Sequence, residues 1–512
     1  MPVEEDFSSH ATARGMLLLA AKDIVSAIAA AGFFLVIARL LPSIADLGVL
    51  TGLHTLIVMF VILSGLGIPH AATRFISTFI GSGERDKALN LYPLIFVFST
   101  AFAAIFSLLL FMISSEISDV LFHDSANVQL IHLTSIDVFL YSLLTTCIFL
   151  LTASMEFKRV TYISILNSIL KYTISFVLLM LGLELNGIVL GFVIGDAIAL
   201  ALFIHALRPK VLRRNIGFSS SVSELGAIMR YALSIYGFQV IGFLSLRIDV
   251  YLLMVFSTMY MVGIYSPVAF AEIAFFIILS AMDQALFPVT SRIFGKSGVT
   301  SFKDSAKYVS RYLFLFYFPL GFALAASTPT LVTITIGERF NESIYPIVIA
   351  IISITLFSPS VLVQNLLRSA GHTGVLLKSG AISLLVQTVI SIVTIPLFGV
   401  LGVSSARAVS RFIVLVIPAY ALEQINGLSI DRIALRNGLA ASVICSVVII
   451  GISTIVPGPS SLILQYLAAL VSFLVFFRLV RAMDDKDIEL IENILSGKLK
   501  WLTDSFAKIV LR

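Results

Sequence analysis

Charged side chains inside long apolar stretches are the residues of this sequence best placed to do chemistry. Lys22 and Asp23 are adjacent, Arg247 and Asp249 stand two apart, and Glu272 stands alone, each among largely apolar residues. An ionisable group inside a membrane costs about 2.5–3.5 kcal/mol on insertion scales, so it normally faces a partner or a wet cavity. Cations there bind phosphate or other anions, and acids there relay protons or bind cations. The sequence therefore predicts buried polar sites among apolar helices.

Two further groups of cations extend this prediction. Arg407 and Arg411 are four residues apart and therefore lie on one helix face. Two like charges so close inside a membrane need anions, either from a ligand or from an unidentified carboxylate. The alternative is that the boundary of this span lies elsewhere. Arg74 and Arg292 each follow a proline by four or five residues and are expected either to attract a phosphate group or to anchor the inner membrane surface. The predicted substrate-binding cations are Lys22, Arg74, Arg247, Arg292, Arg407 and Arg411.

Acidic and histidine side chains are the candidates for ion coupling or gating, namely Asp23, His54, Asp249 and Glu272. Carboxyl groups and imidazoles that face a cavity exchange protons or sodium ions with it. The coupling ion is expected to be H⁺ or Na⁺, and no other cofactor is expected. A hydrogen-bonded packing role is the alternative for His54. Lys171, Asp137 and Asp196 are expected to form a separate internal network, with structural use the leading interpretation.

Catalysis is not expected. The seven histidines and two cysteines show no metal-ligand spacing, and no nucleophile motif occurs. A Gly-x-x-x-x-Gly-Lys-[Ser/Thr] nucleotide-binding loop is also absent from the sequence. Cys147 and Cys445 both fall within apolar stretches, where a small packing role is expected for them.

The elements that must position these residues are about fourteen apolar stretches, each long enough to cross a bilayer. Hydrophobic residues make up 59% of the 512 residues and charged residues only 12%, which indicates an all-α polytopic membrane protein. The expected spans are 16–41, 44–68, 89–112, 128–152, 160–181, 187–207, 231–257, 260–285, 309–336, 344–367, 375–397, 399–422, 434–456 and 460–482.

The charges in the connections set the expected orientation. Lysines and arginines gather in alternate connections, whereas Arg39 and Arg339 are the two that we place on the opposite side. The positive-inside rule then predicts a multi-pass protein of the cytoplasmic membrane with both termini cytoplasmic. The net charge of +5 is thus a topological signal rather than a sign of nucleic-acid binding. Asn341 opens an Asn-Glu-Ser triplet on the outer side, which is a glycosylation site only in a host that modifies such loops.

A weak internal repeat divides the chain. Asp46-Leu47-Gly48-Val49-Leu50 resembles Met261-Val262-Gly263-Ile264-Tyr265, and the Pro69 to Arg74 segment resembles the Pro288 to Arg292 segment. Six spans separate the two copies, so they have the same orientation and predict two lobes around one central cavity. The expected domains are an N-lobe at 1–214, a C-lobe at 215–430, two accessory spans at 431–482 and an amphipathic cytoplasmic tail at 483–512.

This division suggests a gate. Neighbours on a helix point about 100° apart, and residues two apart point about 200° apart. Lys22 and Asp23 are therefore not expected to pair well with each other, and Arg247 and Asp249 each need a partner elsewhere. A cross-lobe interaction of Lys22 or Asp23 with Arg247 or Asp249 would close one side of the cavity. A static packing salt bridge is the alternative.

The first two spans carry a family resemblance. Ala38-Arg39-Leu40-Leu41-Pro42, Asp46-Leu47-Gly48, Gly65-Leu66-Gly67-Ile68-Pro69 and Arg74-Phe75-Ile76-Ser77 resemble the polysaccharide-transporter branch of the multidrug/oligosaccharidyl-lipid/polysaccharide exporter superfamily, which includes the O-antigen-type flippases. The motifs lie mainly in residues 36–90, and the architecture matches over the whole chain. Members typically have a Gly-Pro pair and an acidic–aromatic–Gly step, of which this sequence keeps Pro42 and Gly48.

The resemblance implies a flippase for a lipid-linked oligosaccharide, carried on a polyprenyl phosphate or diphosphate. The glycan would cross through the central cavity by alternating access, without ATP hydrolysis by this chain. Its expected partners are the lipid-linked glycan and membrane lipids. Glycosyltransferases or the polymerase of the same pathway are further candidate protein partners.

Three other functions stay open. A cation-coupled multidrug antiporter of the same superfamily would favour a more acidic cavity than these arginines predict. A membrane-embedded glycosyltransferase or polymerase would need a larger outer loop than the one near 113–127. A scaffold that regulates lipid flipping is the third, although charges within the spans of both halves disfavour it.

Overall fold

The computed structural model describes residues 9–211, 218–297, 302–426, 430–456, 458 and 460–480. The described residues form helices and contain no strand, which confirms the all-α fold class. Within the part of the chain that the structure describes, thirteen segments are long and apolar enough to cross a membrane. One of them, 157–211, holds two helices that pack against each other and are joined at Gly182, whose φ is 85°. The predicted number of about fourteen spans stays a prediction.

The chain divides into two compact units, residues 1–266 and 267–512, which are described separately. The helix α9 contacts α2 and α3, so it belongs with the helices that precede it. The predicted lobe boundaries rest on the sequence repeat and stay a prediction.

The main helices that begin in unit 1 are α1 (Ser9–Leu40), α2 (Ile44–Gly65), α3 (Ile68–Gly81), α4 (Arg85–Met112), α6 (Val128–Ala153), α7 (Phe157–Leu178), α8 (Glu184–Val211), α9 (Phe218–Phe256) and α10 (Met259–Ser297, whose later part is in unit 2).

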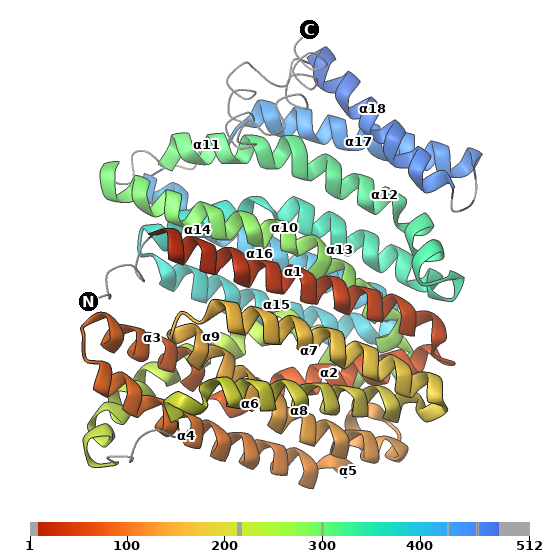
Figure 1. The fold of residues 1–512 in the computed structure, drawn as a ribbon. Coiled ribbons are helices and arrows are strands. Elements are labelled where there is room, and N and C mark those ends of the chain that lie inside the picture. The colour runs from red at the N-terminus through yellow and green to blue at the C-terminus, as the bar shows by residue number, and fades with distance from the viewer. Residues whose placement is uncertain are drawn as a thin grey trace. The chain divides into compact units, whose positions relative to one another are not determined.

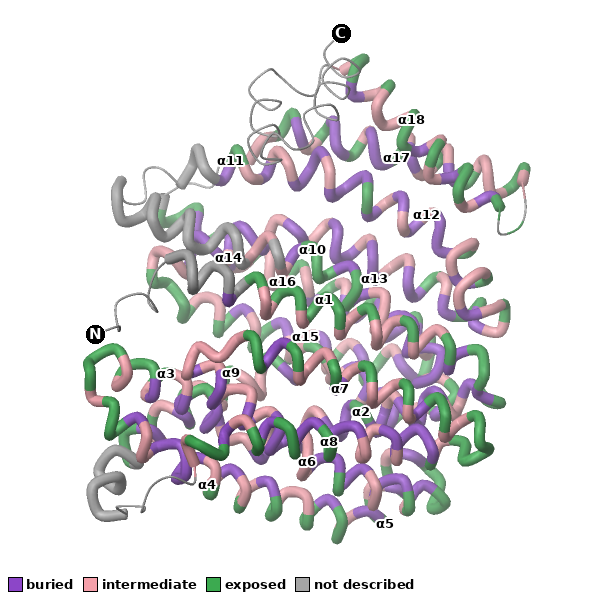
Figure 2. Tube along the Cα trace, viewed as in Figure 1, coloured by how far each residue is buried: buried purple, intermediate pink, exposed green. Residues whose placement is uncertain are grey.

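The core of unit 1 is built around α6, which packs against α2, α3, α4 and α8 (Figure 1). Buried residues are frequent along α6 and sparse along α1 (Figure 2). Serine and threonine hydroxyls fit into these apolar helices because most bond a carbonyl in the preceding turn, as Thr51 does to Leu47. A bond of 2.8 Å between Ser64 and Ser142 joins α2 to α6. Packing of small groups and such bonds replaces the hydrophobic effect, which is weak between helices in lipid.

The predicted span 44–68 ends in a backbone break that sequence reasoning missed. Leu66 and Gly67 both have left-handed backbones, with φ of 45° and 73°, and α3 restarts beyond them with Pro69 in its first turn. A Cβ on Gly67 would lie 2.2 Å from the carbonyl oxygen of Ala232 on α9, so glycine is needed there for space as well as for conformation. The repeat-related helix α10 runs from Met259 to Ser297 without a break.

The two glycines aligned by the sequence repeat meet in space. A Cβ on Gly48 would lie 1.9 Å from the carbonyl oxygen of Met259, and a Cβ on Gly263 would lie 2.0 Å from that of Ile44. The beginnings of α2 and α10 therefore touch backbone to backbone, and the aligned glycines make reciprocal contacts.

Unit 2 contains the rest of α10 and α11 (Phe302–Tyr312), α12 (Phe318–Thr335), α13 (Ile344–Phe357), α14 (Pro359–Ser369), α15 (Thr373–Phe398), α16 (Val400–Asn426), α17 (Arg432–Ile455) and α18 (Ser461–Val480). The predicted span 344–367 was wrong as one helix, because α13 ends at Phe357 and α14 begins at Pro359, which has no N–H to continue the ladder. The predicted accessory helices α17 and α18 pack against each other and against α12. The predicted tail at 483–512 lies outside the described residues.

Candidate functional site

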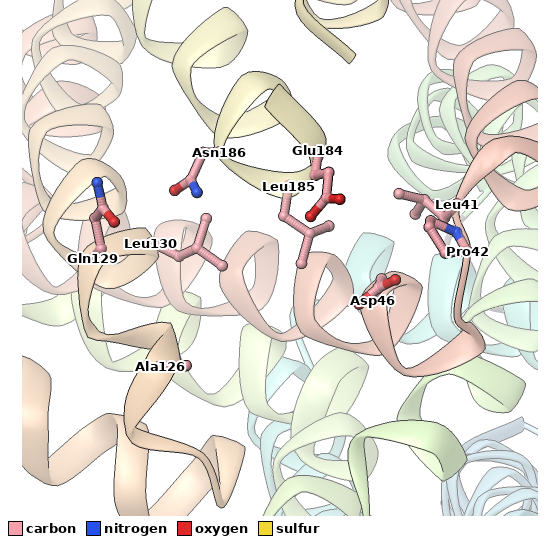
Figure 3. Close-up of a pocket in the computed structure, with 9 residues that line it drawn as sticks. All are labelled: Leu41, Pro42, Asp46, Ala126, Gln129, Leu130, Glu184, Leu185 and Asn186. Atoms are coloured by element: carbon pink, nitrogen blue, oxygen red, sulfur yellow. The ribbon is translucent and has the colours of Figure 1, made fainter. Parts of the chain in front are cut away.

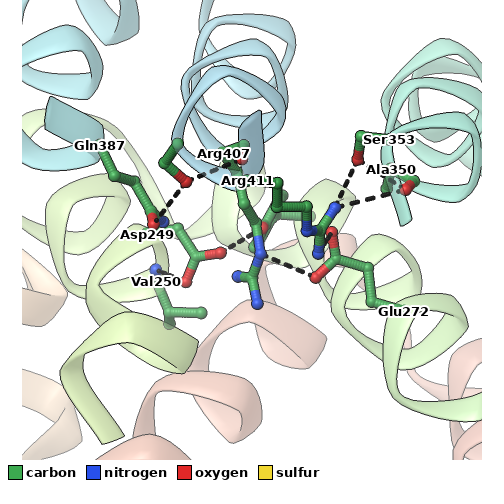
Figure 4. A network of polar contacts seen from close by, with 10 residues as sticks. Asp249, Val250, Glu272, Ala350, Ser353, Gln387, Arg407 and Arg411 are labelled. Atoms are coloured by element: carbon green, nitrogen blue, oxygen red, sulfur yellow. Dashed lines mark hydrogen bonds and ion pairs between the residues drawn. The ribbon is translucent and has the colours of Figure 1, made fainter. Parts of the chain in front are cut away.

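A carboxylate in unit 2 holds two guanidinium groups. Glu272 lies on α10 and is 4% exposed. Its two oxygens lie 2.9 Å from Nε of Arg407 and 2.9 Å from Nη2 of Arg411, both on α16 (Figure 4). The sequence placed these arginines on one helix face and required an anion, and Glu272 is that anion. Its predicted role in ion coupling is untested and stays a prediction.

Neighbouring helices fix the rotation of α16 that brings both arginines to Glu272. On the α13 side, Arg411 donates to the hydroxyl of Ser353 and to the carbonyl of Ala350, the latter at 3.3 Å (Figure 4). On the α15 side, Ser410 donates to Gln387 at 3.3 Å. These contacts hold the guanidinium groups in one place, which favours bidentate binding of a planar or tetrahedral oxyanion.

Unit 1 buries a second cluster, with an aspartate at its centre. Asp196 on α8 is fully buried and accepts from Asn167 at 2.9 Å and from Lys171 at 2.9 Å, both on α7. The predicted network of Lys171 and Asp196 is therefore confirmed as an ion pair. The ammonium of Lys171 also lies 4.7 Å from the ring centre of Phe192, a cation–π contact on the same helix pair. Asp137, the third predicted member, is a fully buried residue of α6.

Other predicted residues of unit 1 lie along α2 and α9. Arg247 and Lys171 both act electrostatically on His54, which keeps exposed surface on α2. Asp249 is fully buried and accepts from the hydroxyl of Tyr265 and from the backbone N–H of Val250 at 2.9 Å (Figure 4). Arg247 and Asp249 thus have different surroundings, as their spacing on the helix predicts.

The expectation for Lys22 and Asp23 was wrong. Their charged groups lie 2.9 Å apart, because the flexible four-carbon stem of lysine reaches around the helix to its neighbour. The helix α1 packs mainly on α7, and the side chain of Asp23 is 72% exposed. The predicted gate between these residues and Arg247 or Asp249 stays a prediction.

Arg74 and Arg292 were predicted as a repeat-related pair. The guanidinium of Arg74 is exposed on α3 and lies 4.1 Å from the ring centre of Tyr231 on α9. Next to it, His70 bonds Gln239 of α9, and burial lowers the pKa of His70, which keeps its imidazole neutral at pH 7. Arg292 lies on α10, and its side chain is outside the described residues.

A pocket of about 240 Å³ opens in unit 1 where α2, α6 and α8 begin (Figure 3). Its polar lining comes from Asp46, Gln129, Glu184 and Asn186. Sequence reasoning missed this pocket, because its residues come from three separate connections. Within the described ranges, no group of three or more His, Cys, Asp or Glu residues is placed to hold a metal ion.

Comparisons with known proteins agree with this architecture. A family model described as "Polysaccharide biosynthesis protein" matches residues 36–345, more than half of the chain. The sequence comparison with curated proteins found no match.

Two solved structures show the same fold. The lipid II flippase MurJ, in its inward closed conformation, has a TM-score of 0.70 and 14% identity, with 90% of this chain and 98% of that chain covered. An inward-facing multidrug resistance MATE family transporter of the MOP superfamily has a TM-score of 0.63 and 14% identity, with 77% and 94% covered. The described helices therefore form a multi-pass membrane protein with the fold of these two structures.

Proposed function

Because the chain belongs to the polysaccharide biosynthesis protein family, we propose that it is a flippase for a lipid-linked oligosaccharide. The lipid is a polyprenyl phosphate or diphosphate, and the protein moves its glycan across the cytoplasmic membrane by alternating access. A proton or sodium gradient drives the cycle. The termini are cytoplasmic, as the distribution of basic residues predicts.

The contact of Arg407 and Arg411 with the single carboxylate of Glu272 is the observation that carries this proposal. Guanidinium groups stay charged under all conditions in proteins and bind phosphate oxygens in pairs. Glu272 presents to them the same kind of oxygen pair that a phosphate presents. A substrate phosphate that enters the site competes with Glu272 for the same donors.

This competition provides differential binding, which a transport cycle requires. A ligand shifts a conformational equilibrium only by as much as its affinity differs between the two states. Exchange of Glu272 for phosphate changes the contacts between α10 and α16, so the loaded and empty forms of unit 2 differ in their helix contacts. A cationic drug gains nothing from the guanidinium groups, which favours the flippase over the multidrug antiporter.

Translocation of a fluorescent lipid-linked oligosaccharide in proteoliposomes, with and without an imposed proton or sodium gradient, tests the proposal. We expect protein-dependent movement that a gradient accelerates, and a loss of about tenfold or more in Arg407→Gln, the size of one lost charge-assisted contact. Arg368→Gln is the matched control, because it breaks an Arg–Asp pair with Asp283 in the same unit.

An equal loss in both variants would show that the effect is not specific to the Glu272 cluster. Absence of lipid movement together with gradient-driven efflux of a cationic dye would replace the flippase with the multidrug antiporter.

A further inference from the structure

Asp137 is a buried acid that lacks a hydrogen-bond partner in the described structure. It lies in the middle of α6 with no exposed surface, and neither of its carboxyl oxygens accepts a bond from any described residue. Buried carboxylates are expensive unless they are paired and hydrogen-bonded. Native structures leave few buried polar groups unsatisfied, so this one needs an explanation.

The face of α6 that carries Asp137 lies against the Asp196 cluster. Tyr141 follows Asp137 by one turn on the same helix face, and its ring centre lies 5.3 Å from the ammonium of Lys171, which bonds Asp196. Asp196 already accepts from Asn167 and Lys171. The amide oxygen of Asn167 is itself buried without a donor among the described residues. Three helices of unit 1, α6, α7 and α8, thus bring two carboxyl groups and one ammonium group together.

These charges do not balance without a further cation. Two ionised carboxylates beside one ammonium leave one negative charge in a buried site, and neither carboxylate can donate a hydrogen bond to the other. One proton on the pair removes that charge and supplies the missing donor. Carboxyl groups that share a site in this way do not both ionise.

The other titratable groups around the pair do not supply this proton. Tyr141 on α6, whose ring centre lies 5.3 Å from the ammonium of Lys171, and Tyr172 on α7 carry phenolic hydroxyl groups, which are ordinarily neutral at pH 7. From α2, His54 has the cations Lys171 and Arg247 as charged neighbours.

Two further helices packed on α6, α3 and α4, also carry charged or titratable groups. On α4 these are Arg85, Asp86 and Lys87 in its first turn, and on α3 they are His70 and Arg74.

We propose that the carboxyl groups of Asp137 and Asp196 hold one exchangeable proton between them, with Lys171 as a built-in counter-cation. The ammonium of Lys171 occupies a place that a bound metal cation would otherwise take, which favours a proton over sodium as the ion that this site exchanges. Loss of the proton leaves a buried negative charge, which draws Lys171 and Asn167 toward Asp137 and changes the packing of α7 against α6.

The role of this proton in transport rests on the proposed function. Under that function, the site in unit 1 is where the proton gradient acts, and the arginines of unit 2 are where the substrate phosphate acts.

Infrared difference spectroscopy of the purified protein tests the site without any transport. We expect a protonated-carboxyl stretching band that shifts in D₂O and is lost in Asp137→Asn, whose amide keeps the shape and donates to Asp196. Glu156→Gln is the matched control, because Glu156 forms ion pairs with Arg159 and Lys210 outside the Asp196 cluster, so the band persists. A band unchanged in Asp137→Asn, or displaced by Na⁺ at constant pH, would overturn the proposal.

If Asp137→Asn fails to fold, the D₂O experiment on the unaltered protein still tests the proposal. Absence of an exchangeable protonated-carboxyl band in the unaltered protein would also overturn the proposed proton site. Translocation assays then separate the two proposals. A band without lipid movement would overturn the flippase and leave the proton site standing. Lipid movement that keeps its proton-gradient dependence in Asp137→Asn would overturn the coupling role.

Discussion

Unit 1 and unit 2 each bury a polar cluster. Acidic groups outnumber basic groups in the cluster of unit 1, and basic groups outnumber acidic groups in the cluster of unit 2. In unit 1, Asp196 pairs with the ammonium of Lys171 and Asp137 is a second buried acid, whereas in unit 2 Arg407 and Arg411 share the carboxylate of Glu272. Carboxyl groups change their charge by taking up a proton, and guanidinium groups do not. The first cluster therefore adapts by protonation, and the second adapts only by exchange of its anionic partner.

The largest expected effect comes from the cluster that cannot change its charge. Glu272→Leu leaves two buried guanidinium groups without their shared carboxylate, and breaking such a contact costs about 3–5 kcal/mol. Denaturant unfolding of the purified protein measures this loss. Glu272→Gln keeps an acceptor oxygen and is expected to lose less. A change below about 1 kcal/mol in the leucine variant would show that the arginines are held by other contacts.

The matching change in unit 1 is expected to be smaller. Lys171→Met removes the ammonium group, but the two aspartates can replace it by binding a second proton, so the loss at pH 7 is about 1–3 kcal/mol. Because the variant must bind more protons when folded, its stability rises relative to the unaltered protein as the pH falls from 7 to 5. Unfolding measured across that range checks the sign. Lys210→Met, which frees the half-buried Glu156, is the control and is not expected to gain in this way.

Replacing an arginine of unit 2 by lysine is expected to have a smaller effect, which is measured in transport rather than in stability. Arg411→Lys keeps the charge beside Glu272 but loses the second set of donors to Ala350 and Ser353. We expect translocation to fall by about tenfold, equivalent to about 1.4 kcal/mol. Arg368→Lys is the control for the same change at a partly exposed pair. Equal rates in Arg411→Lys and the unaltered protein would show that charge alone is enough.

The smallest effect on stability is expected from an exposed ion pair. Lys87 donates to Glu84 at the start of α4, and this hydrogen bond lowers the pKa of Glu84 from its ordinary value. The contribution of this ion pair to the free energy of unfolding is present above the ordinary pKa of glutamate and is lost as the pH falls through the lowered pKa of Glu84. Lys87→Met is expected to leave the melting temperature at pH 7 within error, because exposed pairs contribute little. A clear drop at pH 7 that persists at pH 3 would contradict this interpretation.

The fold was more predictable than the sites. The apolar spans follow from local composition, and α2, α4 and α6 lie close to their predicted ranges. The break at Leu66 and Gly67 contains a glycine, and the break before Pro359 is followed by a proline. Neither residue type by itself distinguishes a kinked helix from a turn between two helices inside an apolar stretch. The repeat aligned Gly48 with Gly263, but it could not show that the two glycines pack on each other's helices.

Sequence spacing placed Arg407 and Arg411 on one face and showed that they need an anion, but it could not identify Glu272, 135 positions before Arg407, as that anion. The rotation of each helix about its axis decides such pairings, and contacts with all of its neighbours set that rotation. The same reason explains why the partnerless state of Asp137 was invisible in the sequence. A bilayer makes each span satisfy its own backbone hydrogen bonds, so spans are determined locally by sequence. Side-chain partners are decided only by tertiary structure, because they depend on how separate helices turn toward one another.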